Sequence, residues 1–326
     1  MRMLRLASIL LLCALPAAAQ DAVYPTYGVH NPPSVSPCAN PDCVYVRSPG
    51  EPSNPVYPAW WSSHWTMYRV YKNYAAYPPP YAGKPPSPLK EGQDYETSYG
   101  ATYYDSTWTD GTRHGAMMEY YDKRCLPIFP IDNHFTCAFI SLGETAFFVT
   151  YPADRPKGMP PVCLFSPRNH PPELDFIEHL PYARSDSARL HFEVQGYSFW
   201  ISGTDGKPVQ TGASPDRTAQ GDILFGYAFE SLPRPDAADP AAAPYRHPQS
   251  FYFSGSTYQP PNAPIVGQNY SDFAMVKPDP AQTWDQVDKL DPASLPQCQL
   301  FNPPAPQAVA RAPGHPVGTW AGPRHK

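Results

Sequence analysis

The sequence has no long apolar run beyond its first residues and no cluster of basic side chains. After residue 15 no segment approaches the roughly 20 apolar residues that a membrane-spanning helix requires. The chain carries 24 basic and 29 acidic side chains, a net charge of −5. This composition argues against binding to nucleic acid or to anionic membranes, both of which attract basic surfaces.

Several motifs of metal and nucleophile chemistry are also missing. There is no Gly-x-Ser-x-Gly elbow and no His-Glu-x-x-His pair, and no cysteine spacing matches a zinc site. His170, His179 and His191 fall in one region, but without tight ligand spacing. We therefore expect neither a metal site nor a cofactor.

The first 19 residues have the pattern of a cleavable secretory leader. Arg2 and Arg5 precede an apolar run, and the small residues at 17–19 supply a cleavage site. The run is too short to span a bilayer. We expect a protein exported to the periplasm or the medium, and the pattern does not separate these two destinations.

Cysteine usage fits export. One of the seven cysteines, Cys13, lies in the leader, which leaves an even number for the mature chain. In an oxidising compartment these would form disulfides, although six cysteines allow many pairings. The most economical pairings are Cys38–Cys43, Cys125–Cys137 and Cys163–Cys298.

Proline is abundant, with 46 residues, and it interrupts any helical pattern. Short alternating runs bounded by Gly, Pro and Asp predict strands instead. The predicted strands cover 64–71, 101–109, 116–121, 135–142, 145–151, 162–165, 190–194, 198–202, 223–229, 251–258 and 272–276. Asp110-Gly111 and Gly143-Glu144 mark hairpin turns. Strands of this number and spacing predict an all-β fold, a β-sandwich or jelly roll.

This pattern suggests four parts of the chain. Residues 1–19 form the leader, and 20–98 form a Pro- and Tyr-rich segment that packs on the domain. Residues 99–300 form the jelly-roll domain. Residues 301–326, rich in Pro, Ala and Gly, form a disordered tail. The oligomeric state cannot be derived from the sequence.

The densest group of acids is Glu173, Asp175 and Glu178, with the spacing Glu-x-Asp-x-x-Glu. On a strand, Glu173 and Asp175 share a face, and one β-bulge would return Glu178 to that face. Two converging carboxyl groups about 5 Å apart are what a retaining glycosidase needs. Alternatively, Pro172 begins a short helix whose apolar residues pack inward and whose acids face solvent.

The acidic motif resembles the Glu-[Ile/Leu]-Asp-x-x-Glu signature of the family-16 glycoside hydrolases. The preceding strand at 146–151 and the Lys-Gly turn at 157–158 are also similar to that family. The resemblance covers residues 146–194. It implies a concanavalin-like jelly roll with Glu173 as nucleophile, Asp175 as helper, Glu178 as acid/base and His191 beside them. The sequence departs from the family in having no Trp in the strand before the motif.

Aromatic residues make up 14% of the chain and include a cluster at Trp60, Trp61 and Trp65. Such side chains stack on sugar rings when exposed and fill the core when buried. Trp65 and Trp200 are candidates for substrate stacking.

Together, the leader, the acidic motif and the aromatic residues predict a secreted retaining endo-glycosidase that acts on a β-linked polysaccharide. A non-catalytic glycan-binding or cell-surface structural protein, or an acidic helix in an unrelated β-rich fold, is the alternative.

Overall fold

The computed structural model describes residues 49–70, 79–125, 134–166, 171–172, 174–190, 194–201, 223–231, 245–254 and 265–298. The expected leader and tail lie outside these ranges, as do Cys38 and Cys43. Within them the regular secondary structure is mainly β-strand, with a few short helices, which confirms the predicted all-β class.

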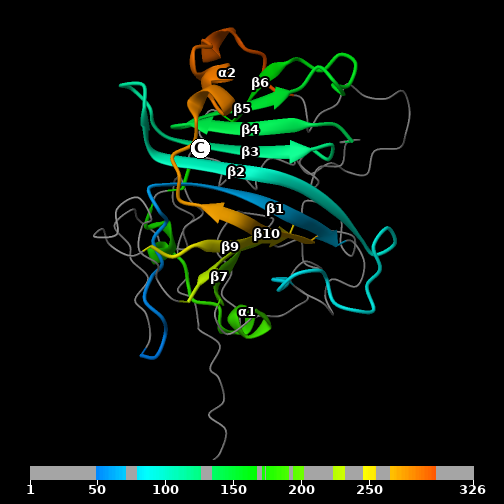
Figure 1. The fold of residues 1–326 in the computed structure, drawn as a ribbon, viewed down its shortest axis with the longest axis vertical. Coiled ribbons are helices and arrows are strands. Elements are labelled where there is room, and N and C mark those ends of the chain that lie inside the picture. Colours follow the sequence, from blue (N-terminus) through cyan, green and yellow to red (C-terminus); the bar gives the residue numbers. More distant parts are fainter. Residues whose placement is uncertain are drawn as a thin grey trace, which may run out of the picture.

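Ten antiparallel strands form one continuous sheet in the order β6-β5-β4-β3-β2-β1-β10-β9-β8-β7 (Figure 1). The strands are β1 (Trp60–Val70), β2 (Tyr95–Thr109), β3 (His114–Asp122), β4 (Cys137–Leu142), β5 (Thr145–Thr150), β6 (Val162–Ser166), β7 (Val194–Ile201), β8 (Ile223–Glu230), β9 (Pro248–Ser254) and β10 (Ile265–Ala274).

Most predicted strands correspond to observed ones. The turn at Gly143 and Glu144 closes the hairpin between β4 and β5, where Leu142 faces Thr145. Gly143 has φ +54°, a conformation that glycine adopts without steric cost. The strand expected at 190–194 is not confirmed, because Leu190 follows helix α1 (Arg184–Arg189) and 191–193 lie outside the described residues.

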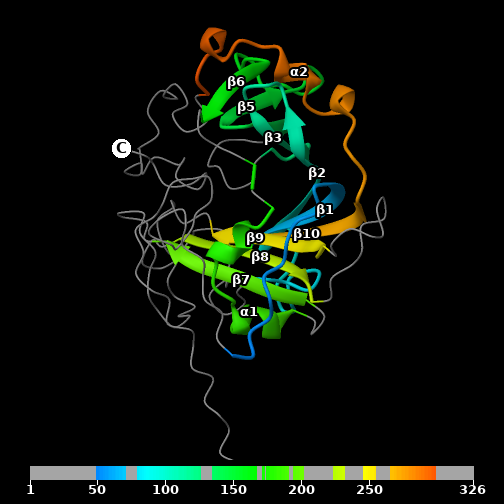
Figure 2. The same ribbon diagram turned by 90° about the vertical axis from the view of Figure 1, so that its left-hand side faces the viewer.

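A single sheet replaces the two packed sheets expected of a sandwich. β1 and β10, far apart in the chain, pair at its centre and join the two halves. Figure 2 shows both halves, β2–β6 and β7–β9, turning toward the same side of the molecule. The domain boundary expected at residues 98 and 99 falls inside β2, and β1 belongs to the sheet centre.

The two sides of the sheet carry different cores. The inner face, toward which the halves turn, carries the largest buried cluster, which includes Trp61, Trp65, Tyr104, Tyr121, Phe148, Tyr197 and Phe225. The outer face carries three smaller clusters. Helix α2 (Asp285–Asp288) supplies Val287 to one of them, and Trp284 precedes that helix. Since both faces are apolar, strand sequences in this sheet do not alternate simply between polar and apolar residues.

Both edge strands are covered by irregular chain segments. At the β6 edge, the Leu164 N–H donates to the Pro296 carbonyl and the Cys298 N–H donates to the Leu164 carbonyl. At the β7 edge, the Ala183 N–H donates to the Gly196 carbonyl. Unpaired strand edges invite association with other chains, so these contacts protect the sheet.

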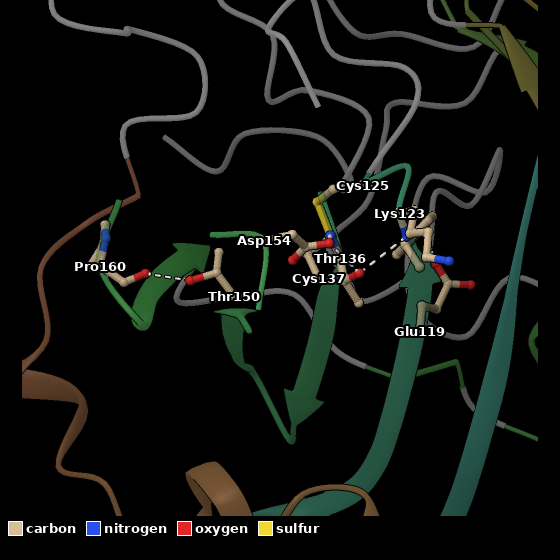
Figure 3. Close-up of a disulfide and its surroundings, with 9 residues drawn as sticks. Glu119, Lys123, Cys125, Thr136, Cys137, Thr150, Asp154 and Pro160 are labelled. Carbon is tan, nitrogen blue, oxygen red and sulfur yellow. Dashed lines mark hydrogen bonds between the residues drawn. A yellow bond between two sulfur atoms is a disulfide. The ribbon is translucent and has the colours of Figure 1, made fainter. Parts of the chain in front are cut away.

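Two predicted disulfides are confirmed. Cys125–Cys137 holds the chain that follows β3 against β4, and Cys163–Cys298 holds the C-terminal segment against β6. Figure 3 shows the first of them near Thr136 and Asp154. There the Thr136 hydroxyl donates to Asp154 Oδ2 at 2.7 Å, which ties the start of β4 to the segment after β5.

Candidate functional site

The acidic motif does not lie on a strand. Asp175 is in a turn, and Glu178 belongs to the 3₁₀ helix η1 (Phe176–His179). Asp175 is exposed and Glu178 is half-buried, whereas Glu173 lies outside the described residues. The bulged-strand interpretation is therefore wrong, because Pro171 and Pro172 are followed by a turn, and a short helix replaces the strand.

Apolar side chains explain why this segment folds as it does. Phe176, Ile177 and Leu180 are buried against the inner face. The backbone is anchored as well, since the Tyr104 hydroxyl donates to the Pro172 carbonyl at 2.6 Å and the Tyr57 N–H donates to the Leu174 carbonyl. The segment thus covers part of the inner face. A short helix does form, as in the alternative, but it begins at Phe176 and not at Pro172.

The other residues predicted for the site are His191, Trp200 and Trp65. His191 lies outside the described residues, and Trp200 belongs to β7. Trp65 is 1% exposed, so it cannot stack on a sugar at the surface. Its ring packs edge-on against Tyr121, with centroids 5.2 Å apart. Trp65 is a core residue.

The inner face instead contains a buried carboxyl group, Glu119, in the middle of β3. Glu119 is 8% exposed, and the Tyr121 hydroxyl donates to its Oε2 at 2.7 Å. Burial raises the pKa of the Glu119 carboxyl, and the Tyr121 hydrogen bond offsets this only in part. The environment therefore favours the protonated, uncharged form more than water does.

Tyrosines from distant parts of the sheet surround this carboxyl. Burial is the main cause that raises the pKa of Tyr227 on β8 and of Tyr270 on β10, and the Glu119 charge adds to it. The same carboxyl also contributes to the raised pKa of Tyr57. Because β3 and β8 belong to opposite halves of the sheet, this convergence reflects the sheet's curvature (Figure 2).

Gln268 on β10 completes the group. It is fully buried and pairs with Met67 on β1 and Phe251 on β9, both of the inner face. Its amide lies close enough to Glu119 to lower the pKa of that carboxyl. However, neither its nitrogen nor its oxygen has a hydrogen-bond partner of good geometry. We call Glu119, Tyr121, Tyr227, Gln268 and Tyr270 the Glu119 site.

Solvent reaches part of this site. Tyr227, Phe251 and Tyr270 are only half-buried, although they lie on the inner face near the middle of their strands. The Tyr227 and Phe251 rings pack with centroids 5.1 Å apart, and Phe176 meets Tyr227 edge-on at 4.8 Å. The arrangement offers aromatic walls around a carboxyl and an amide.

The sequence around Glu119 carries a signal of its burial, although it forms no motif. In β3 the neighbours on its own face are Met117 and Tyr121, and the opposite face carries Met118 and Tyr120. An acid in a strand that is apolar on both faces must be buried, and a buried acid is a candidate for function.

The described residues contain no group of His, Cys, Asp and Glu side chains that could hold a metal ion. None of the helices in the described ranges has the length and apolar character of a membrane span.

Comparisons with known proteins do not support the glycosidase family. No family model matches the chain, and no curated protein matches it. One matching solved structure is the crystal structure of a DUF1329 family protein from Desulfovibrio piger ATCC 29098, with 10% identity and a TM-score of 0.32. The match covers 70% of this chain and 91% of that one. The predicted membership of the family-16 glycoside hydrolases is therefore wrong.

Proposed function

We propose that this chain is an exported, non-catalytic binding protein that holds a compact, ring-containing molecule against the inner face of its sheet. The observation that carries the proposal is the partial exposure of three aromatic residues of the inner face. Tyr227 and Tyr270 are close enough to Glu119 for its charge to raise their pKa, and Phe251 pairs with Gln268. Binding sites for small molecules are mostly apolar and aromatic, with a few polar groups that orient the ligand.

Export is supported by the leader pattern of residues 1–19 and by the two disulfides, since disulfides persist mainly in oxidising compartments. Cell fractionation of the full chain, beside a variant that lacks residues 1–19, tests this part of the proposal. The full chain is expected outside the cytoplasm, and the shortened chain inside it.

A compact ligand is favoured over a polymer because the largest aromatic side chains are buried. Trp61 and Trp65 are inaccessible, and the half-buried rings lie within the curve of the sheet. A sugar ring has an apolar face and hydroxyl groups, so the glycan binding predicted from the sequence fits this site only for a short saccharide or a chain end.

Binding can be tested with N-phenyl-1-naphthylamine, an uncharged probe that fluoresces strongly in apolar surroundings. We expect a saturable increase in fluorescence with the native protein. Phe251→Ala should weaken binding roughly three- to tenfold, because one aromatic wall is removed. Tyr99→Ala is the control, since Tyr99 is 58% exposed on the outer face. No saturable signal, or equal loss in both variants, would contradict the proposal.

Hydrolysis of a β-linked polysaccharide, with Glu173 as nucleophile and Glu178 as acid/base, stays a prediction. Its test is depolymerisation of β-glucans, agarose and carrageenans by the native protein beside Glu173→Gln. Cleavage that the variant loses would replace the binding function with an enzymatic one. No cleavage by either protein is the result expected of a binding protein.

A further inference from the structure

Gln268 is an unusual residue for the interior of this sheet. Its side chain is fully buried, yet both polar atoms of its amide lack a hydrogen-bond partner of good geometry. A buried amide whose hydrogen bonds have poor geometry destabilises a fold, and leucine would occupy similar space without that cost. Natural proteins depart from good packing in this way mainly at functional sites.

The surroundings of Gln268 indicate what its amide faces. Its neighbours across the sheet, Met67 and Phe251, offer no hydrogen-bonding side chain. One ionisable group that the amide influences is Glu119, one oxygen of which accepts the Tyr121 hydroxyl. The hydroxyl of Thr102, which pairs with Glu119 across β2 and β3, is also buried, and it lies close enough to Tyr270 to lower the pKa of that residue.

We propose that Glu119 and Gln268 bind the polar group of the ligand, and that this group is uncharged and both donates and accepts hydrogen bonds, as a hydroxyl or an amide does. This inference rests on the function proposed above. An amide offers one donor group and one acceptor, and a carboxyl group adds a further acceptor and, when protonated, a donor.

The charge of the ligand follows from the same geometry. An ionised Glu119 would repel an anion, and a protonated Glu119 would leave the anion buried without a countercharge. No basic side chain belongs to the Glu119 site as defined from the described residues. Aromatic faces and an ionised carboxylate would attract a cation, but a protonated Glu119 would leave it buried without a countercharge.

Competition against N-phenyl-1-naphthylamine separates these cases. The competitors are naphthalene, 2-naphthol, 2-naphthoate and 2-naphthylmethylammonium, which share one ring system and differ in the polar group. We expect 2-naphthol to displace the probe at a roughly tenfold lower concentration than naphthalene, and both ions to compete less well than 2-naphthol. Equal competition by naphthalene and 2-naphthol, or the strongest competition by an ion, would overturn the inference while leaving the proposed function intact. If the probe itself does not bind, the proposed function fails.

Gln268→Leu should abolish the preference for 2-naphthol over naphthalene. Asn269→Leu is the matched control, since Asn269 is the next residue of β10 and its amide donates to the Gly83 carbonyl on the outer side. The control should keep the preference. Gln268→Leu should also unfold at a higher temperature than the native protein, because a buried amide with poorly formed hydrogen bonds is removed.

Glu119→Leu provides a second route that does not depend on Gln268→Leu. It removes a hydrogen-bonding group from the site whichever protonation state Glu119 has, so the preference for 2-naphthol over naphthalene should shrink. An unchanged preference would show that Glu119 does not face the polar group, and would overturn the inference.

Discussion

The hydroxyl of Tyr121 donates a 2.7 Å hydrogen bond to Glu119, two residues earlier on the same strand. Both side chains therefore lie on the inner face, and each keeps the other's polar group from being buried alone. The pair anchors the polar centre of a face that is otherwise mainly aromatic.

Tyr121→Phe removes this hydrogen bond while keeping the ring that packs against Trp65. We expect the free energy of unfolding to fall by about 1–3 kcal/mol, because a buried carboxyl group loses a donor. Urea denaturation at pH 7 measures the change. Tyr120→Phe is the control, because Tyr120 lies on the opposite face and keeps its edge-on contact with Tyr151 as phenylalanine. Equal losses in the two variants would mean that the hydrogen bond contributes little.

The Glu119 carboxyl should also make stability depend on pH. Its pKa in the folded protein is raised above the usual 4.5, so the folded state holds a proton that the unfolded chain releases. This contribution to stability is fully present below about pH 4.5 and is lost as pH rises toward the folded-state pKa. In Glu119→Gln the side chain cannot ionise.

The free energy of unfolding of Glu119→Gln, minus that of the native protein, should therefore increase as pH rises from about 4.5. Chemical denaturation of both proteins between pH 4 and pH 8, at constant ionic strength, gives this difference. A difference that stays constant, or that decreases with pH, would show that the folded-state pKa of Glu119 is not raised.

The strands and two disulfides could be predicted because their signals are local or depend on export. Strands are indicated by short alternating runs, and hairpins by Asp-Gly and Gly-Glu turns. Disulfides are indicated by an even cysteine count in an exported chain. The hairpin at Gly143 and the pairing of Cys125 with Cys137 are examples.

The number of sheets and the position of the site could not be predicted in this way. Pairing of β1 with β10 joins residues about 200 positions apart, and nothing local in either strand specifies that partner. The motif at Asp175 and Glu178 satisfied a strand-based signature, but burial of Phe176 and Ile177 on the inner face outweighed that pattern. Glu119 could not be identified as a site residue from the sequence alone, because one acid among apolar residues forms no motif and its partners lie on other strands.

The packing of the outer face can also be tested, because the ring of Tyr252 lies there against Gly226. A Cβ atom at position 226 would come within 2 Å of that ring. Gly226→Ala should therefore lower the free energy of unfolding by about 1–3 kcal/mol or more, because the ring must move and its hydroxyl bond to Asp186 is disturbed.

A double-mutant cycle with Tyr252→Ala identifies the cause of that loss. Once the ring is removed, Gly226→Ala should cost at least about 1 kcal/mol less than it does in the native background. Chemical denaturation of the four proteins measures the coupling. Additive losses would show that the backbone at position 226, and not the ring, opposes the larger residue.

The two disulfides should differ in what they contribute to stability. Cys125–Cys137 spans 12 positions and Cys163–Cys298 spans 135. Because a longer closed loop restricts the unfolded chain more, paired replacement by alanine should cost about 3 kcal/mol for the first and about 5 kcal/mol for the second. Replacing both cysteines of a pair avoids a free thiol, and chemical denaturation under oxidising conditions compares the variants.

The backbone bonds between Leu164 and the segment at 296–298 can form in the folded state without the second disulfide. The larger cost should therefore arise from the unfolded chain. If replacing Cys125 and Cys137 lowers the free energy of unfolding more than replacing Cys163 and Cys298, the buried packing of the first pair on the inner face outweighs loop length.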